Sequence, residues 1–428
     1  MTHFDSRGVF SRLCERAFLL GFRGPGETID MAEAHLTELR GLVESLGILV
    51  VGTMLIALKV VKTRSLIGRG KVEEVARRID DVDADLVVSD ADLSPAQQRN
   101  LENEWDITVI DRCELILDIF ANRASTREAV IQVALARMQY TLPRLTRAWT
   151  HLSRQRGGAR GNRGKGETQL ESDHRLVQDR IASLKKDLIK VREQRDARRK
   201  RRFDNAIPSV SLVGYTNAGK SSLLNSICGS DVLVEDRLFA TLDPTTRSFD
   251  GPGNRRVLFT DTVGFIRKLP HALVDAFRST LEEAIFADVI LHVADAGSSE
   301  LDQHIATTES VLMELGAGGK ARILALNKAD ALSPNQREDL ALRYPAGIFV
   351  SARRGLGLDS LTRAVFRALD VGKSTASLFL PPHRWNLRAR LYRESRVLEE
   401  TFDKSGARLL VRISAEEKSR FADYILDA

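Results

Sequence analysis

Near the middle of the chain stands the octapeptide Gly214-Tyr215-Thr216-Asn217-Ala218-Gly219-Lys220-Ser221. Its two glycines, followed by Lys and Ser, have the spacing of a phosphate-binding loop. The residues before it, 210–213, are typical of a buried strand, and those after it, 222–226, of a helix. Glycine lets backbone N–H groups turn toward phosphate oxygens, and the helix adds its positive end. The octapeptide therefore predicts a nucleotide site, with Lys220 on the β- and γ-phosphates and Ser221 on Mg²⁺.

Composition favours an ordinary soluble protein of several domains. The chain has 428 residues, of which 43% are hydrophobic and 29% charged. Its three cysteines lie far apart, which argues against a disulfide framework or a zinc site. The longest apolar run, 46–58, is too short to span a bilayer, and the charged amino terminus does not resemble a signal peptide. We expect a cytoplasmic monomer.

Positive charge is concentrated in one segment. Residues 154–202 contain 17 Lys and Arg against 7 Asp and Glu, whereas the whole chain has a net charge of only +6. A charge run is usually a solvated helix face, but this one is strongly of one sign. It indicates a polyanionic partner, and nucleic acid is the better of the two interpretations.

Four domains are expected, in an α/β chain built on a mainly parallel sheet around the phosphate loop. Residues 1–125 and 205–370 both alternate strand-like and helix-like runs, which predicts α/β domains. In the second of these, strands are expected to end at Val213, Thr260, Val293, Leu326 and Val350, and a helix is expected over 272–285. Residues 371–428 should form a small α+β domain, with a helix over 415–425.

Residues 126–204 should form an antiparallel helical hairpin. Apolar side chains recur in heptad spacing on both sides of a glycine-rich stretch. They include Ile131, Leu135 and Met138 in the first helix, and Ile181, Leu184 and Leu188 in the second. Pro143 should break the first helix near Leu142, and a capping box of Thr168 and Glu171 should begin the second.

The tip of this hairpin, 157–166, interleaves glycines with Arg160, Arg163 and Lys165. Cations on a backbone that can approach closely suit RNA phosphates. The alternative is a mobile linker, which would not need heptads in phase on both sides. We therefore predict that the tip binds RNA.

Two further motifs follow the phosphate loop in the order that a GTPase requires. In Asp261-Thr262-Val263-Gly264, the carboxylate can hold Mg²⁺ through water and the glycine N–H can reach the γ-phosphate. Before it, in Phe239-Ala240-Thr241-Leu242-Asp243, a threonine can close over Mg²⁺. By position alone, Thr245 and Thr246 are rivals for that role.

Guanine recognition is predicted from two more strand ends. In Asn327-Lys328-Ala329-Asp330, the carboxylate can accept hydrogen bonds from N1–H and the amino group of guanine, which adenine cannot donate. Asn327 should support the loop, and the Lys328 stem should cover the base. In Ser351-Ala352-Arg353, the backbone can contact the guanine O6.

These strings resemble the HflX family of GTPases, within the wider Obg-related translational GTPases. The matching strings are GYTNAGKSS, LFATLDPTTR, DTVGFI, NKAD and SAR, and, outside that domain, SLIGRGKVEE, DLVVSDADLSPAQQRNLE, VIDRCELILDIFANRASTRE and GKGETQLESDHRL. The resemblance covers roughly residues 10–370. Where this chain has Lys165, family members usually have Pro.

The resemblance implies a cytoplasmic GTPase at the ribosome or the membrane surface, which binds the large (50S) ribosomal subunit and its rRNA and dissociates stalled or stressed ribosomes. It selects Thr241 as the switch threonine, a Mg²⁺ ligand beside Ser221. The residues that then act on the phosphates are Lys220, Thr241 and Gly264.

Phe265 occupies the position at which many GTPases carry a glutamine that orients the attacking water. We therefore expect slow intrinsic hydrolysis, with the ribosome supplying the missing organisation. Two other interpretations stay open: an RNA-remodelling protein with a mainly structural nucleotide, GTP or more weakly ATP, and a P-loop kinase or ATPase. Competition between GTP and ATP, with and without Asp330→Ala, distinguishes them.

Overall fold

The computed structural model of the 428-residue chain describes residues 15–58, 64–147, 163–204, 207–229, 238–239, 241–252, 255–267, 285–403 and 405–426. The chain folds as two compact units. The first comprises Met1–Arg192, Asp236–Leu242 and Lys268–Phe277, and the second comprises Glu193–Glu235, Asp243–Arg267 and Arg278–Ala428. Within the described ranges, no helix combines the length and the apolar character that a membrane crossing requires.

The first unit begins with a four-stranded parallel sheet in the order β2-β1-β3-β4. Its elements are β1 (Arg16–Arg23), α1 (Ile29–Ser45), β2 (Leu49–Ala57), α2 (Arg69–Asp81), β3 (Leu86–Ser89), α3 (Pro95–Trp105), β4 (Thr108–Asp111) and α4 (Arg112–Arg123). Helices α3 and α4 begin at side-chain caps, Ser94 in a capping box and Asp111. The predicted α/β domain with parallel pairing is confirmed.

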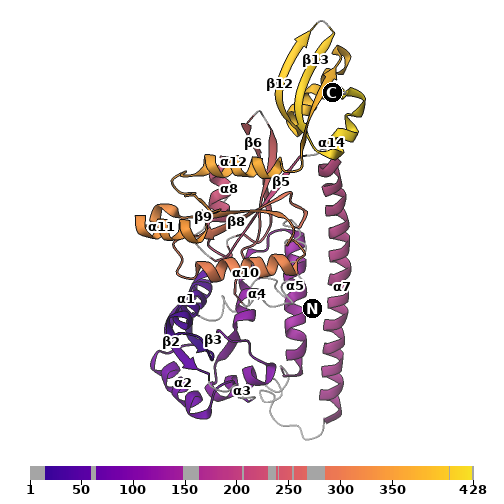
Figure 1. Cartoon of the computed structure of the whole chain (residues 1–428). Helices are drawn as coiled ribbons and strands as arrows, with labels where there is room; N and C mark the ends of the chain where they lie inside the picture. Colours follow the sequence, from indigo (N-terminus) through magenta and orange to yellow (C-terminus); the bar gives the residue numbers. More distant parts are fainter. Residues whose placement is uncertain are drawn as a thin grey trace. The chain divides into compact units, whose positions relative to one another are not determined.

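The helical hairpin is confirmed where its two helices pack. Helix α5 (Arg127–Thr141) and helix α7 (Arg163–Asp204) share a buried cluster of leucines, Leu135, Leu184 and Leu188, flanked by Ile131, Met138 and Ile181. These are positions of the predicted heptads. A 3₁₀ turn over Leu142–Arg147 follows α5, as Pro143 predicted. Figure 1 draws α7 as the longest helix of the chain.

The start of the second hairpin helix was predicted wrongly. Helix α7 begins at Arg163, so residues 163–166 of the predicted tip are helical and Thr168 does not cap it. Glycine lowers helix propensity by only about 1 kcal/mol, so Gly164 and Gly166 do not stop a helix of this length. The rest of the tip, including Arg160, lies outside the described residues.

The second unit carries a six-stranded sheet in the order β10-β9-β8-β5-β7-β6. The strands are β5 (Ser209–Val213), β6 (Thr245–Asp250), β7 (Arg256–Asp261), β8 (Val289–Asp295), β9 (Ala321–Asn327) and β10 (Ile348–Phe349). All pairs are parallel except β6 with β7. The sequence did not predict β6, because its polar residues are half-buried or exposed on an edge. The helix predicted over 272–285 falls almost entirely outside the described residues.

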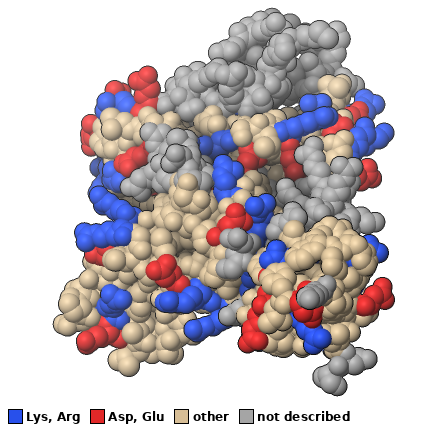
Figure 2. Space-filling model, turned by 90° about the horizontal axis from the view of Figure 1, so that it is seen from above, with Lys and Arg blue, Asp and Glu red and all other residues tan. Residues whose placement is uncertain are grey.

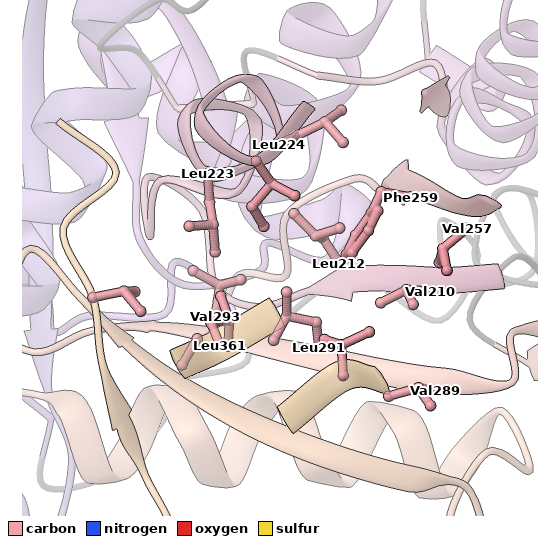
Figure 3. Close-up of a cluster of buried hydrophobic side chains, with 14 of the residues drawn as sticks. Val210, Leu212, Leu223, Leu224, Val257, Phe259, Val289, Leu291, Val293 and Leu361 are labelled. Carbon is pink, nitrogen blue, oxygen red and sulfur yellow. The ribbon is translucent and has the colours of Figure 1, made fainter. Parts of the chain in front are cut away.

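Apolar side chains of two helices pack against the strands of this sheet and form a buried core. Helix α8 (Lys220–Cys228) contributes Leu223 and Leu224, and helix α12 (Leu358–Leu369) contributes Leu361. Figure 3 shows them against Leu212 and Leu291 of the central strands. Helices α10 (Leu301–Glu314) and α11 (Pro334–Arg343) contribute to separate buried clusters, α10 through Leu301 and Leu312 and α11 through Leu340. The four strands β5, β7, β9 and β10 run parallel, so the predicted motifs emerge at one edge of the sheet.

The chain ends in a three-stranded antiparallel sheet in the order β11-β13-β12. Its elements are β11 (Ser374–Leu380), α13 (Trp385–Glu394), β12 (Arg396–Asp403), β13 (Gly406–Ile413) and α14 (Ala415–Arg420). The predicted α+β domain is confirmed, although the helix expected over 415–425 ends at Arg420 and continues as a 3₁₀ turn.

Candidate guanine-nucleotide site

The phosphate loop joins β5 to α8 through two positions that accept glycine alone. Gly214 has φ +152°, and a Cβ on it would lie 2.0 Å from the Val293 carbonyl oxygen. Gly219 has φ +87°, and its Cβ would lie 2.3 Å from the Asn327 amide nitrogen. The loop is therefore packed against Val293 of β8 and against Asn327 of the guanine motif, and its tight turn leaves backbone N–H groups for phosphate.

Lys220 lies buried at the amino end of α8. Its Nζ donates to the carbonyl oxygens of Gly214 at 3.2 Å and Tyr215 at 2.9 Å. Burial lowers the pKa of Lys220 to about 8, and the nearby Asp261 carboxylate opposes this shift. A phosphate chain would add negative charge and favour the protonated form, so this lysine is placed to bind β- and γ-phosphates.

The predicted magnesium residues Ser221 and Asp261 lie together. Ser221 Oγ donates to Asp261 Oδ2 at 2.6 Å, and the Thr262 hydroxyl fixes this strand end by donating to the Leu212 carbonyl at 2.6 Å. A hydroxyl and a carboxylate are the oxygen ligands that Mg²⁺ prefers, so these residues fit the ion. Thr241 belongs to the other compact unit, and its role as a ligand stays a prediction.

The segment after Asp261 lies directly on the phosphate loop. A Cβ on Gly264 would lie 2.9 Å from both Lys220 Nζ and the Thr216 Cα. The side chain of Phe265 is only 1% exposed and packs with Val213 and other apolar residues. The residue in the usual glutamine position is thus a core residue, and it cannot orient water.

Asn327 connects three of the predicted motifs. Its Nδ2 donates to the Ala218 carbonyl at 2.9 Å, and its Oδ1 accepts from the Ala352 N–H at 3.1 Å. The predicted supporting role of Asn327 agrees with this geometry. Since one side chain ties the phosphate loop to the loop after β10, the base-binding and phosphate-binding parts are held in register.

The guanine loop places Asp330 as an ionised carboxylate. A hydrogen bond from the Ser351 side chain, with Arg354 nearby, holds the pKa of Asp330 below its usual value. Lys328 has a left-handed backbone, φ +61°, and its Nζ lies 2.8 Å from Asp295 Oδ2. The predicted acceptor for guanine is therefore charged, and the lysine stem is fixed beside it.

The sequence did not predict several contacts of this site. Asp295 at the end of β8 pairs with Lys328, and Ser226 of α8 donates to the Ala352 carbonyl at 2.6 Å. The sequence signal that could have identified Asp295 is its position just after a predicted strand. The rival Thr246 lies in β6, where its hydroxyl bonds to that of Thr260.

The other predicted site residues have different outcomes. In the first unit, Phe239 is buried and packs edge-on against Phe120 of α4, with ring centroids 4.7 Å apart. Ala240 lies outside the described residues. Arg163 and Lys165 lie in α7, and their side chains are not described. The remaining positions, Asn217, Leu242, Asp243, Val263, Ala329 and Arg353, lie in the loops that the motifs predicted.

Three protein-family models match successive parts of the chain. They are described as GTP-binding GTPase N-terminal (residues 33–121), GTP-binding GTPase Middle Region (123–202) and 50S ribosome-binding GTPase (209–328). Among solved structures, a GTP-binding protein from Sulfolobus solfataricus in complex with GDP is 26% identical, with a TM-score of 0.44, covering 83% of this chain and 98% of that chain.

Relatives match along nearly the whole sequence. The GTPase HflX of Caldanaerobacter subterraneus subsp. tengcongensis is 42% identical, covering 99% of this chain and 96% of the relative. That of Akkermansia muciniphila is 43% identical, covering 97% and 98% respectively. That of Escherichia coli is 41% identical, covering 89% of each. The chain therefore belongs to the HflX family and is a GTPase.

Proposed function

We propose that this GTPase binds the large ribosomal subunit as its Mg²⁺·GTP complex, separates stalled or stressed ribosomes, and hydrolyses GTP faster when the ribosome is bound. The observation that carries the proposal is the burial of Phe265. The apolar, buried side chain at that position cannot orient the attacking water. A component supplied in trans can raise the rate of such a GTPase by about 10³–10⁵.

Magnesium is part of this proposal. Ser221 would ligate the ion directly, Asp261 through water, and Thr241 would add a second hydroxyl. The ion would neutralise charge that develops on the β- and γ-phosphates during hydrolysis. Lys220 and the Gly264 N–H would donate hydrogen bonds to the same phosphates.

The ribosome is the partner that the comparisons and the charge distribution favour. The model that matches residues 209–328 carries the description 50S ribosome-binding GTPase. On the face drawn in Figure 2, basic and acidic side chains are interspersed over the described atoms. In the sequence, the excess of Lys and Arg over 154–202 is a feature that suits ribosomal RNA.

Sedimentation of ribosomes tests the proposal. Intact ribosomes are mixed with the protein and a non-hydrolysable GTP analogue, then separated on a gradient. We expect free small subunits and co-sedimentation of the protein with large subunits. The control is Lys220→Ala with the same analogue, which should leave ribosomes intact. If the wild-type protein stays at the top of the gradient, the proposed partner is wrong.

A further inference from the structure

The phosphate loop is joined to the segment after Asp261 by a short parallel bridge. Tyr215 pairs with Phe265. The Thr216 N–H donates to the Phe265 carbonyl at 2.7 Å, and the Phe265 N–H donates to the Gly214 carbonyl at 3.0 Å. These two bonds set the register between the loop that binds phosphate and the segment that carries Gly264.

Tyr215 adds a third bond through its side chain. The Arg267 N–H donates to the Tyr215 hydroxyl at 2.8 Å. The tyrosine is only 7% exposed, and its ring stacks on His304 of α10, with centroids 3.8 Å apart and planes 16° apart. Because the ring is held on one face by the imidazole, its hydroxyl can hold Arg267 in place.

We propose that Tyr215 is a positioning residue for GTP hydrolysis. Its hydroxyl fixes the backbone beyond Phe265 and thereby holds the Gly264 N–H in the register that the γ-phosphate requires. Tyr215 thereby acts on the segment that carries Gly264, in addition to belonging to the loop that binds the nucleotide.

The chemistry of the phosphate loop does not itself require this hydroxyl. The loop binds phosphate through backbone N–H groups and Lys220, and a phenylalanine at position 215 could make the same stack on His304. A buried hydroxyl costs free energy unless it is hydrogen-bonded, and here it accepts a hydrogen bond from the Arg267 N–H. The hydroxyl therefore acts by fixing the backbone of the segment after Gly264.

The packing at Gly264 makes catalysis sensitive to this bond. A Cβ on Gly264 would lie 2.9 Å from Lys220 Nζ, so the backbone of Gly264 runs against the lysine that meets the γ-phosphate. A small displacement of residues 264–267 would move the Gly264 N–H relative to that lysine. Misplacement of a group that acts in the transition state lowers kcat more than it weakens substrate binding.

The variant Tyr215→Phe removes the hydroxyl and retains the ring. We expect kcat for GTP to fall about five-fold, the worth of one net hydrogen bond, while KM and the affinity for GDP stay unchanged. Amide hydrogen exchange at Arg267 should accelerate by a similar factor, because its N–H loses its acceptor. The exchange measurement reports on the bond itself and does not depend on turnover.

A matched control completes the test. Tyr344→Phe removes a hydroxyl that donates to Asp302 on α10 of the same unit, and it should leave kcat unchanged. The proposal is overturned if Tyr215→Phe leaves kcat unchanged, raises it, or weakens GDP binding as much as it lowers kcat.

Discussion

Gly219 leaves no space for any side chain, because the Asn327 amide occupies the position that a Cβ would take, at 2.3 Å. In Gly219→Ala the left-handed backbone would be strained, and Asn327 would lose its bond to the Ala218 carbonyl. Together these effects cost about 2–3 kcal/mol, so we expect GDP and GTP affinity to fall on the order of 100-fold. Isothermal titration calorimetry measures it.

Gly229→Ala is the matched control at the other end of α8. Gly229 also has a left-handed backbone, φ +60°, but nothing lies within 4 Å of a Cβ added there. The same strain should lower the free energy of unfolding by about 1 kcal/mol and leave nucleotide affinity unchanged. Equal affinities for the two variants would show that contact with Asn327 is unimportant.

We expect Asp330 to decide which base the site accepts. In Asp330→Asn the side chain offers one acceptor and one donor, which fits the N1–H and O2 of xanthine and leaves the guanine amino group facing a donor. We expect the affinity for GTP to fall at least about ten-fold, from an unpaired group that costs about 1–3 kcal/mol. Xanthosine triphosphate should gain affinity by a comparable factor. Competition between GTP and xanthosine triphosphate measures this change of base preference. Undiminished GTP binding would contradict the role assigned to Asp330.

At the scale of elements, the sequence predicted those parts of the fold that have a local cause. An apolar strand followed directly by a polar motif predicted the loops after β5, β7, β9 and β10. This worked because each buried strand and the polar residues at its end are adjacent in the sequence. Strand β6 was missed because its pairing with β7, rather than its own apolar pattern, makes it a strand. The ion pair of Asp295 with Lys328 forms because β8 and β9 are neighbours in the sheet. That pairing cannot be predicted from the residues of either strand alone.

Helices α4 and α5 enclose a carboxyl group that gives the first unit a pH-dependent stability. Burial, reinforced by the Asp111 carboxylate, raises the pKa of Glu114 to about 7. Gln98 and the Tyr140 hydroxyl contact the same carboxyl oxygen. Between about pH 4.5 and 7 the folded state holds a proton that the unfolded state releases, so stability falls as pH rises through this window.

The variant Glu114→Gln should remove this dependence. Glutamine does not ionise, so the variant should be more stable than the wild type at pH 8, by up to about 3 kcal/mol, and the difference should shrink toward pH 5. Thermal unfolding followed at both pH values measures it. Glu33→Gln, on an exposed position of α1, is the control and should leave the pH dependence unchanged. A constant difference between wild type and Glu114→Gln at all pH values would contradict the assignment.

At the scale of the whole molecule, the chain combines a guanine-nucleotide site with a long basic helical segment. We expect removal of the charges at Arg160, Arg163 and Lys165 to weaken binding to large subunits. It should also reduce the steepness with which binding declines as salt increases, because fewer counterions are released. Binding isotherms at several salt concentrations measure both effects. Unchanged isotherms would show that the segment is a linker that does not bind the ribosome.

We propose that the ribosome completes a catalyst in which Phe265 lies in the core. The most direct measurement is the rate of GTP turnover with and without purified large ribosomal subunits, at saturating GTP and Mg²⁺. We predict slow turnover for the protein alone and a rise of about 10³–10⁵ when subunits are added. Turnover that large subunits leave unchanged would contradict the claim.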